Sequence, residues 1–470
     1  MTTTTAQSQT ASAASGRLRQ PQLIGYAAGD AANNLAFSMT SMFLLLYYTD
    51  VVGITAAAAG TLFLVVRAWD AFADIFAGRV VDRTMTRWGK FRPFFLFASL
   101  PLLLLSVATF SVPGGLSHTG KLVYAYLTYA ALGLMYSLVN IPYGSLASAM
   151  TQVPQERAKL ASFRLVGTAV TIIMLAFVVA PQIKSSTNLQ RSLTITTSVF
   201  VVVGYALYLV VFATARENVV RDVAHVSLKQ SLATLRHNRP LAMLCLSALA
   251  FLTAMFTLQT VQAYYARDVL GNANYFILLT LVSTGAMFVV APFMPKIVRT
   301  MGKRKGYIAA GALAIVAGIG ISWSPPSVPA IPVVFFALMG VALAAVNILM
   351  FALEADTVEY GEWKTGVRTE GITYALFSFT RKLGQAVGGA AAAYAIGLGG
   401  YVAHARTQTE GALHTIRYTA GFVPAAFILI AIVIMYFYPL TEARFTQMVA
   451  ETAERRAARA AAQSEHPAGP

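Results

Sequence analysis

The sequence has little charge and almost no cysteine. Only 11% of its 470 residues are charged, and the 19 acidic residues are outnumbered by 35 basic ones. An average soluble protein carries about 25% charged residues, so an ordinary soluble domain is excluded. The single cysteine, Cys245, has no partner for an internal disulfide, and its apolar surroundings are typical of a buried small side chain.

Motifs for catalysis are also missing. The six histidines all fall in predicted loops or tails. The sequence contains no metal-ligand cluster, no nucleophile motif and no phosphate-binding glycine loop. We therefore expect that the protein is not an enzyme and that it needs no cofactor.

Long hydrophobic runs dominate what remains. Hydrophobic residues make up 57% of the chain, and the mean hydropathy is +0.62. A helix needs roughly 20 apolar residues to cross a bilayer, and runs of this length recur twelve times along the sequence. The predicted spans are 24–48, 56–80, 93–111, 121–146, 161–182, 193–213, 241–263, 274–295, 306–323, 331–353, 371–398 and 418–438. The fold class predicted is an all-α integral membrane protein.

The distribution of basic residues predicts the orientation of these spans. A net charge of +16 would fit a nucleic-acid-binding protein, but most of the lysines and arginines gather in alternate loops between spans. This asymmetry is typical of loops that face the cytoplasm. We expect both termini in the cytoplasm, a lipid bilayer as the partner, no nucleic acid, and a monomer.

The chain is divided by its longest polar connection into two halves that repeat each other. The predicted parts are a disordered tail (1–20), a six-helix bundle (21–213), a cytoplasmic connection (214–240), a second six-helix bundle (241–440) and a cytoplasmic tail (441–470). Similar basic segments follow spans two and eight, at 82–90 and 298–305. Parallel duplication of six spans is the plan of the major facilitator superfamily, in which substrate binds between the halves near the bilayer midplane.

Asp30, Asp70 and Asp74 are the only acids inside the predicted spans. A charge at bilayer depth costs about 2.5–3.5 kcal/mol on the insertion scale, so such residues are usually functional. Asp70 and Asp74 are four residues apart and share one helix face. They predict a site for a proton or Na+. The alternative is an ion pair with Arg67, although one arginine cannot satisfy both acids.

Basic and amide side chains inside the spans predict a substrate site. Arg164 lies in span five, and Arg381 and Lys382 lie in span eleven. Surplus positive charge suits an anionic substrate, since arginine binds a carboxylate through two parallel hydrogen bonds. Arg381 and Lys382 cannot both face the cavity because helix neighbours point about 100° apart. Asn140 of span four is expected either to bind sugar hydroxyls or to join two helices.

A charged segment follows span ten. Residues 354–370 are dense in charge, and we expect their acids to pair with basic loops as a cytoplasmic gate; solvated loop charges are the alternative. Glu359 and Arg368 are the gating residues predicted there.

Five motifs show that the chain resembles the glycoside-pentoside-hexuronide:cation symporters, the family of the melibiose permease. They are spread in order over nearly the whole chain, at 47–53, 69–74, 87–93, 140–146 and 355–362. Within the family the sequence is most similar to the bacterial glucuronide carriers, on the segments 29–34, 136–140, 365–368 and 377–382.

The resemblance implies symport of a glycoside with a cation across the bacterial inner membrane. It implies that Asp70, Asp74 and Ser137 hold the cation and that Asp30, Arg164 and Lys382 contact sugar or couple it to the cation. Asn140 stands where the melibiose permease has a sugar-binding aspartate, which fits an anionic glucuronide. Ala73 replaces an asparagine of the cation site. This favours a proton, with Na+ as the alternative.

Other interpretations stay open. The same machine could carry a neutral oligosaccharide or pentoside. A membrane sensor on this fold should have a large cytoplasmic output domain, and the sequence has no such domain. An exporter of amphipathic compounds would tend to have an apolar cavity without paired acids.

Overall fold

The structure is a computed structural model that describes residues 18–151, 154–217, 238–365, 370–403, 405 and 407–465. Described residues form helices, apart from one isolated bridge between Thr86 and Gly89. The first half contains α2 (Gln20–Tyr47), η1 (Tyr48–Val52), α3 (Ala56–Arg83), α4 (Arg92–Phe97), α5 (Ser99–Thr109), α6 (His118–Met150), α7 (Pro154–Ser185) and α8 (Leu189–Thr214).

The second half repeats this pattern of long helices. It contains α10 (Arg239–Tyr264), η2 (Tyr265–Val269), α11 (Tyr275–Val290), η3 (Ala291–Phe293), α12 (Met294–Trp323), α13 (Ala330–Thr365), α14 (Glu370–Leu398), α15 (Glu410–Ala420), α16 (Phe422–Tyr436) and α17 (Glu442–Glu465). The predicted tail at 1–20 lies mostly outside the described residues, as does most of the connection at 214–240.

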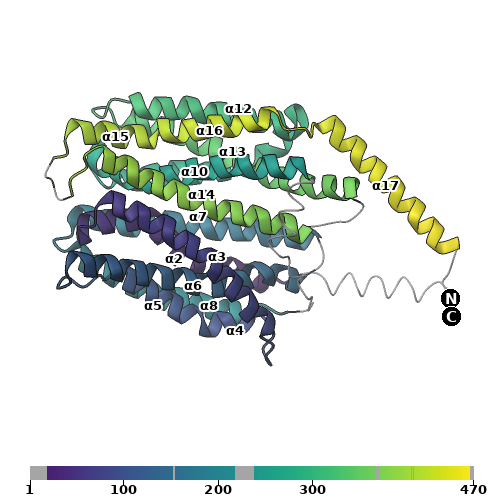
Figure 1. Cartoon of the computed structure of the whole chain (residues 1–470), viewed down its shortest axis with the longest axis horizontal. Helices are drawn as coiled ribbons and strands as arrows, with labels where there is room; N and C mark the ends of the chain where they lie inside the picture. The colour runs from purple at the N-terminus through teal and green to yellow at the C-terminus, as the bar shows by residue number, and fades with distance from the viewer. Residues whose placement is uncertain are drawn as a thin grey trace. The chain divides into compact units, whose positions relative to one another are not determined.

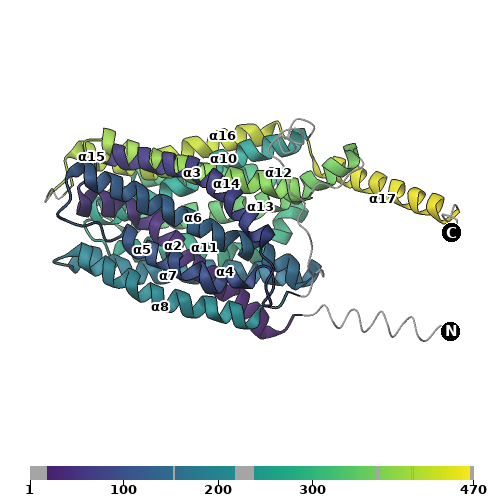
Figure 2. The same cartoon turned by 60° about the horizontal axis from the view of Figure 1, so that its bottom comes forward.

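The chain is organised as two compact units. Unit 1 is Met1–Asp222 with Gln259–Leu281 and Gly389–Ile416. Its helices α2, α3, α5, α6 and α8 lie side by side (Figures 1 and 2). Unit 2 is Val223–Leu258 with Val282–Gly388 and Arg417–Pro470. In unit 2, α12 packs against α13 and α16, and α17 continues beyond them (Figure 2).

Ten segments of the described chain are long and apolar enough to cross a membrane. One of them, Tyr275–Trp323, contains the predicted spans eight and nine, and α14, the predicted span eleven, is not among the ten. Within the 49-residue segment the backbone breaks at Gly302, whose φ of 76° lies in the left-handed region. The predicted spans thus fall on helices of the structure, and the number twelve stays a prediction.

Local sequence fixes where the helices of unit 1 begin. The side chains of Thr55, Ser117 and Asn188 each accept a hydrogen bond from the backbone N–H three residues on, at the starts of α3, α6 and α8. Such caps satisfy N–H groups that have no partner within the helix.

The start of α4 is held by an acid from the far end of the bundle. The Glu217 carboxylate accepts hydrogen bonds from the backbone N–H groups of Lys90, Phe91 and Arg92 at 2.8–3.1 Å. The Arg92 guanidinium donates in return to the Phe212 carbonyl of α8. A carboxylate at a helix N-terminus is stabilised by the helix dipole, so Glu217 ties α4 to the end of α8.

The predicted end of span ten at residue 353 is too early. α13 continues to Thr365 and carries Glu354 and Asp356, which are both buried. The spanning candidates also include Asp50 and Asp268 at the ends of α2 and α10. Asp30, Asp70 and Asp74 are therefore not the only acids in the long helices. A hydrophobic window misses the others because they lie in the last turns, where the polarity of the sequence rises.

Candidate functional site

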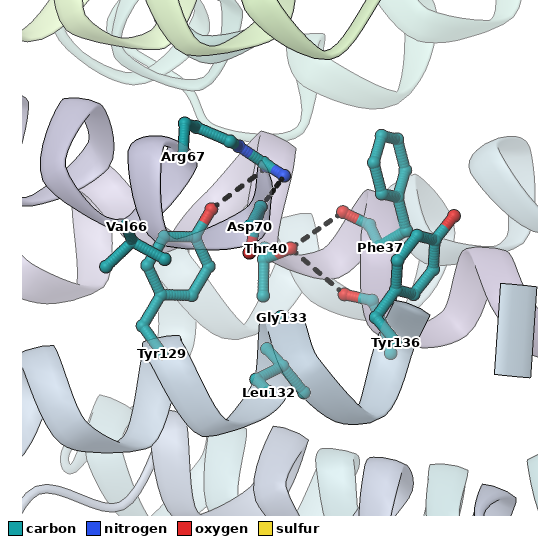
Figure 3. A pocket seen from close by; sticks show the side chains of 10 residues that line it. Phe37, Thr40, Val66, Arg67, Asp70, Tyr129, Leu132, Gly133 and Tyr136 are labelled. Carbon is teal, nitrogen blue, oxygen red and sulfur yellow. Dashed lines mark hydrogen bonds and ion pairs between the residues drawn. The ribbon is translucent and has the colours of Figure 1, made fainter. Parts of the chain in front are cut away.

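The two acids of α3 lie against α6, each beside a different partner. Asp70 is 5% exposed, and its Oδ2 lies 2.8 Å from Nη1 of Arg67. Nη2 of Arg67 donates to the Tyr129 hydroxyl of α6 at 3.2 Å (Figure 3). The ion pair foreseen as an alternative is thus present at Asp70. Arg67 offsets one of the two negative charges on this helix face.

Asp74 is paired with Ser137 instead. The Ser137 hydroxyl lies 2.6 Å from Oδ1 of Asp74 and 3.1 Å from the carbonyl of Gly133. A hydroxyl has one proton to donate, and the shorter contact with a carboxylate is the stronger one. Ser137 is 2% exposed, and Asp74 is half-buried. The structure therefore brings together Asp74 and Ser137, two residues that the family resemblance assigns to one cation site.

Gly133 lets the Asp70 carboxylate approach the backbone of α6. A Cβ atom at this position would lie 2.2 Å from Oδ1 of Asp70 and 3.3 Å from its Cγ. Only glycine fits, because any side chain would displace the carboxylate.

Beside Asp70 is a small cavity in unit 1, of about 20 Å³. The side chains that line it come from α2, α3 and α6 (Figure 3): Phe37, Thr40, Val66, Arg67, Asp70, Tyr129, Leu132 and Tyr136, with Ala36 and Gly133. The rings of Phe37 and Tyr136 stack, with centroids 5.5 Å apart. A cavity of this size holds about one water molecule or small cation. Asp70 is its one acidic lining residue.

Asp30 forms a second charged cluster in unit 1, between α2 and α7. Its carboxylate is 2.8 Å from Nε of Arg164 and 3.1 Å from Nδ2 of Asn34, and it also accepts from the Thr168 hydroxyl. The Asp30 side chain is 3% exposed, whereas that of Arg164 is 39% exposed. Asp30 is thus buried behind Arg164, and the arginine is the member of the pair that a solute can reach.

The other residues predicted for substrate lie on separate helices. Asn140 is half-buried on α6, one turn after Ser137. On α14 of unit 2, Lys382 is half-buried. Arg381 is exposed and lies over the Phe351 ring, 5.1 Å from its centroid. The two neighbours differ in exposure, as their different helix faces require.

Of the predicted gate, the structure describes one residue. Glu359 is half-buried on α13, and Arg368 lies outside the described residues. Another acid of the same segment, Asp356, does pair with a basic segment: Nζ of Lys303 is 2.7 Å from its Oδ1. The Lys303 ammonium also lies over the Phe445 ring of α17.

Two residues of these clusters were missed in the sequence. Thr168 lies four residues after Arg164, so it shares the helix face that meets Asp30, and this spacing could have revealed it. Tyr129 carries no such signal. Which of the tyrosines of α6 meets Arg67 depends on how the helix is rotated against α3.

Comparisons with known proteins identify the family. Residues 25–442 match the family described as MFS/sugar transport protein. The chain belongs to this family. It is 48% identical to the glucuronide carrier protein homolog of Escherichia coli (strain K12), over 92% of this chain and 95% of that protein. It is 33% identical to the isoprimeverose transporter of Lactiplantibacillus pentosus, over 92% of this chain and 91% of that protein.

A solved structure agrees on the fold. The crystal structure of the nucleoside transporter NupG superposes with a TM-score of 0.62 at 12% identity, covering 92% of this chain and 99% of that one. The family resemblance and the all-α major facilitator fold predicted from the sequence are confirmed. The protein is a multi-pass membrane transporter of the sugar symporter family.

Proposed function

We propose that this protein is a symporter that imports glucuronides together with one proton. The observation that carries this proposal is the arrangement on α3: Asp70 paired with Arg67, and Asp74 one turn away on the hydroxyl of Ser137. This face keeps one net negative charge, because Arg67 offsets only one of the two acids. One monovalent cation neutralises it.

A proton suits this set of groups better than Na+. The oxygens that face one another here are the two carboxylates and one hydroxyl, and Ala73 beside them offers no oxygen. A proton needs only one carboxylate oxygen, whereas a metal cation in water must exchange several water ligands for protein oxygens. We therefore assign the proton to Asp74 and Asp70, with Ser137 as the hydrogen-bonding neighbour.

Arg164 supports an anionic sugar. Its guanidinium is partly exposed, and Asp30, buried behind it, fixes its orientation through Nε. Because Nε is used in this way, the remaining nitrogens of the fork are the ones oriented to bind the substrate carboxylate. Lys382 and Arg381 add positive charge from α14, and Asn140 adds an amide from α6. The 48% identity to a protein named as a glucuronide carrier homolog supports the same substrate class.

Coupling follows from linkage. A state that binds sugar better when the cation site is occupied must also bind the cation better when sugar is present. The basic-residue asymmetry places both termini in the cytoplasm, and we assign import as the direction, with a bacterial inner membrane as the location.

Uptake into proteoliposomes tests the cation site. Asp70→Asn and Asp74→Asn should each abolish uphill accumulation of a labelled glucuronide under an imposed proton gradient, because each removes a titratable group. Exchange of labelled for unlabelled glucuronide at equal concentrations should survive, and it serves as the folding control. Normal uphill accumulation in either variant would remove the proposed coupling site.

A neutral glycoside is the second candidate substrate, favoured by the similarity to an isoprimeverose transporter. Arg164→Gln and Lys382→Gln separate the two candidates. For a glucuronide carrier, both variants should weaken binding of the glucuronide at least tenfold more than binding of the matched neutral glucoside, since about 1.4 kcal/mol of charge interaction corresponds to tenfold. Equal losses for both ligands would favour the neutral substrate.

A further inference from the structure

The ends of α2 and α10 repeat each other in sequence and in backbone. Each helix passes from two adjacent tyrosines into a five-residue π-helix, η1 (Tyr48–Val52) and η2 (Tyr265–Val269). Each π-helix is soon followed by a glycine with positive φ, Gly53 at 80° and Gly271 at 70°. Short π segments are rare and are frequent at functional sites. The two halves of the chain thus carry the same special turn.

Unit 1 joins these two turns through a charged network. Arg267 of η2 donates twice to its neighbour Asp268, at 2.9 and 2.8 Å, and its Nη1 lies 3.5 Å from Oδ1 of Asp50 in η1. The Tyr401 hydroxyl, from the segment after α14, donates to the same Asp50 oxygen at 2.6 Å and accepts from Arg267. The side chains of Asp50, Asp268 and Arg267 are 11%, 12% and 22% exposed.

Hydroxyl and aromatic contacts reinforce this network. The hydroxyls of Thr49 and Tyr264 lie 2.8 Å apart. The ring of Tyr264 meets that of Tyr401 edge-on, with centroids 5.3 Å apart, and the Arg267 guanidinium lies over it. Residues from both halves of the sequence are therefore held together at this end of unit 1.

Small residues bring α3 and α14 together within the same unit. A Cβ on Gly60 would lie 3.2 Å from the Cβ of Ala393, and the Thr61 and Tyr394 hydroxyls are 2.8 Å apart. Close approach of this kind lets helices separate without leaving large side chains unpacked.

We propose that Asp50, Arg267, Asp268 and Tyr401 form a gate that holds the two halves of the chain together at this end and opens once in each transport cycle. The inference rests on the proposed transport function, since alternating access requires the halves to part at each side in turn. By the proposed topology this end faces away from the cytoplasm.

The arrangement of charges makes the gate reversible. A buried ion left without its partner costs far more than an intact pair gains. When Asp50 moves away, Arg267 keeps its two hydrogen bonds with Asp268, and Asp50 keeps the Thr49 hydroxyl at 2.8 Å. Neither charge is stranded by opening. Asp268 is the standing partner of Arg267, and Asp50 is the partner that is exchanged.

Reversible cross-linking tests the gate. In a Cys245→Ser background, Gly60→Cys and Ala393→Cys place two cysteines with Cβ atoms near the about 3.5–4.5 Å that a disulfide needs. Oxidation should form the bond and stop uptake of a labelled glucuronide, and reduction should restore it. Undiminished uptake by fully cross-linked protein would overturn the proposal.

Charge variants test the role of the network. Asp50→Asn, and Tyr401→Phe as a second variant that removes only a hydroxyl, should slow cross-linking by about threefold or more, because each loses a hydrogen bond of the closed state. Asp268→Asn is the matched control: it frees Arg267 for Asp50 and should leave the rate unchanged or raise it. Equal rates in all four proteins would also overturn the proposal. Cross-linking needs no substrate, so failure of the proposed glucuronide transport would leave this result readable.

Discussion

Adding one methyl group to α6, in the variant Gly133→Ala, should displace the Asp70 carboxylate and weaken cation binding. The new Cβ would lie 2.2 Å from Oδ1 of Asp70, whereas real Cβ contacts begin at about 3.0 Å. The oxygen must then move by about 1 Å, twice the roughly 0.5 Å within which a binding group must be held. Asp70 is buried and bonded to Arg67, so the shift also disturbs that ion pair.

The size of the effect follows from the contact that is lost. One charge-assisted hydrogen bond contributes about 1.5–3 kcal/mol, which corresponds to about 10- to 150-fold in affinity. The proton concentration that gives half-maximal uptake of a labelled glucuronide should therefore rise by about that factor. The assay is initial uptake into proteoliposomes as a function of external pH.

A second glycine provides the control. Gly285 lies inside α11, and a Cβ there would meet nothing within 4 Å. Gly285→Ala should leave the pH dependence of uptake unchanged. If Gly133→Ala, correctly folded by its melting temperature, also keeps the wild-type pH dependence, the contact of Asp70 with α6 is not part of the cation site.

Three further variants test other contacts. Ser137→Ala should weaken cation dependence by about tenfold, through loss of the hydrogen bond to Asp74, with sugar exchange retained; an unchanged pH profile of uptake would contradict this. Thr168→Val should reduce glucuronide affinity several-fold in a direct binding assay, because Asp30 loses a donor and holds Arg164 less firmly; unchanged affinity would show that this donor does not matter. Glu217→Gln should lower the melting temperature in detergent by weakening the contacts at the start of α4, worth about 1–3 kcal/mol, and an unchanged melting temperature would assign Glu217 no stabilising role.

The sequence predicts the fold well because its strongest signals are local. Apolar runs of bilayer length and the basic residues between them need no knowledge of packing, and the predicted spans fall on helices of the structure. The end of span ten is different. Glu354 and Asp356 make the sequence polar there, yet α13 continues because packing in unit 2 buries both acids.

The candidate site could be predicted in part. The four-residue spacing of Asp70 and Asp74 indicates a shared helix face, and the family resemblance adds Ser137, which the structure places on Asp74. Contacts between helices were out of reach. That Asp30 is buried behind Arg164, and that Tyr129 meets Arg67, depends on helix rotation, which one sequence does not specify.

The network of Asp50, Arg267 and Tyr401 shows a signal that was present but not used. Both halves contain two adjacent tyrosines followed by an aspartate, at Tyr47–Asp50 and Tyr264–Asp268, with one extra residue in the second copy. The extra residue is Arg267, the cation between the two aspartates. An insertion inside a repeat thus marks the residue that joins the halves.

Simultaneous measurement of proton and sugar movement tests the central claim most directly. In proteoliposomes without an imposed gradient, adding a glucuronide outside should make the external medium more alkaline as protons enter with the sugar. Asp74→Asn should abolish this change while still exchanging labelled glucuronide. Glucuronide entry by the wild-type protein with no accompanying proton movement, at any external pH, would contradict the assignment of Asp70 and Asp74 as a proton-coupling pair.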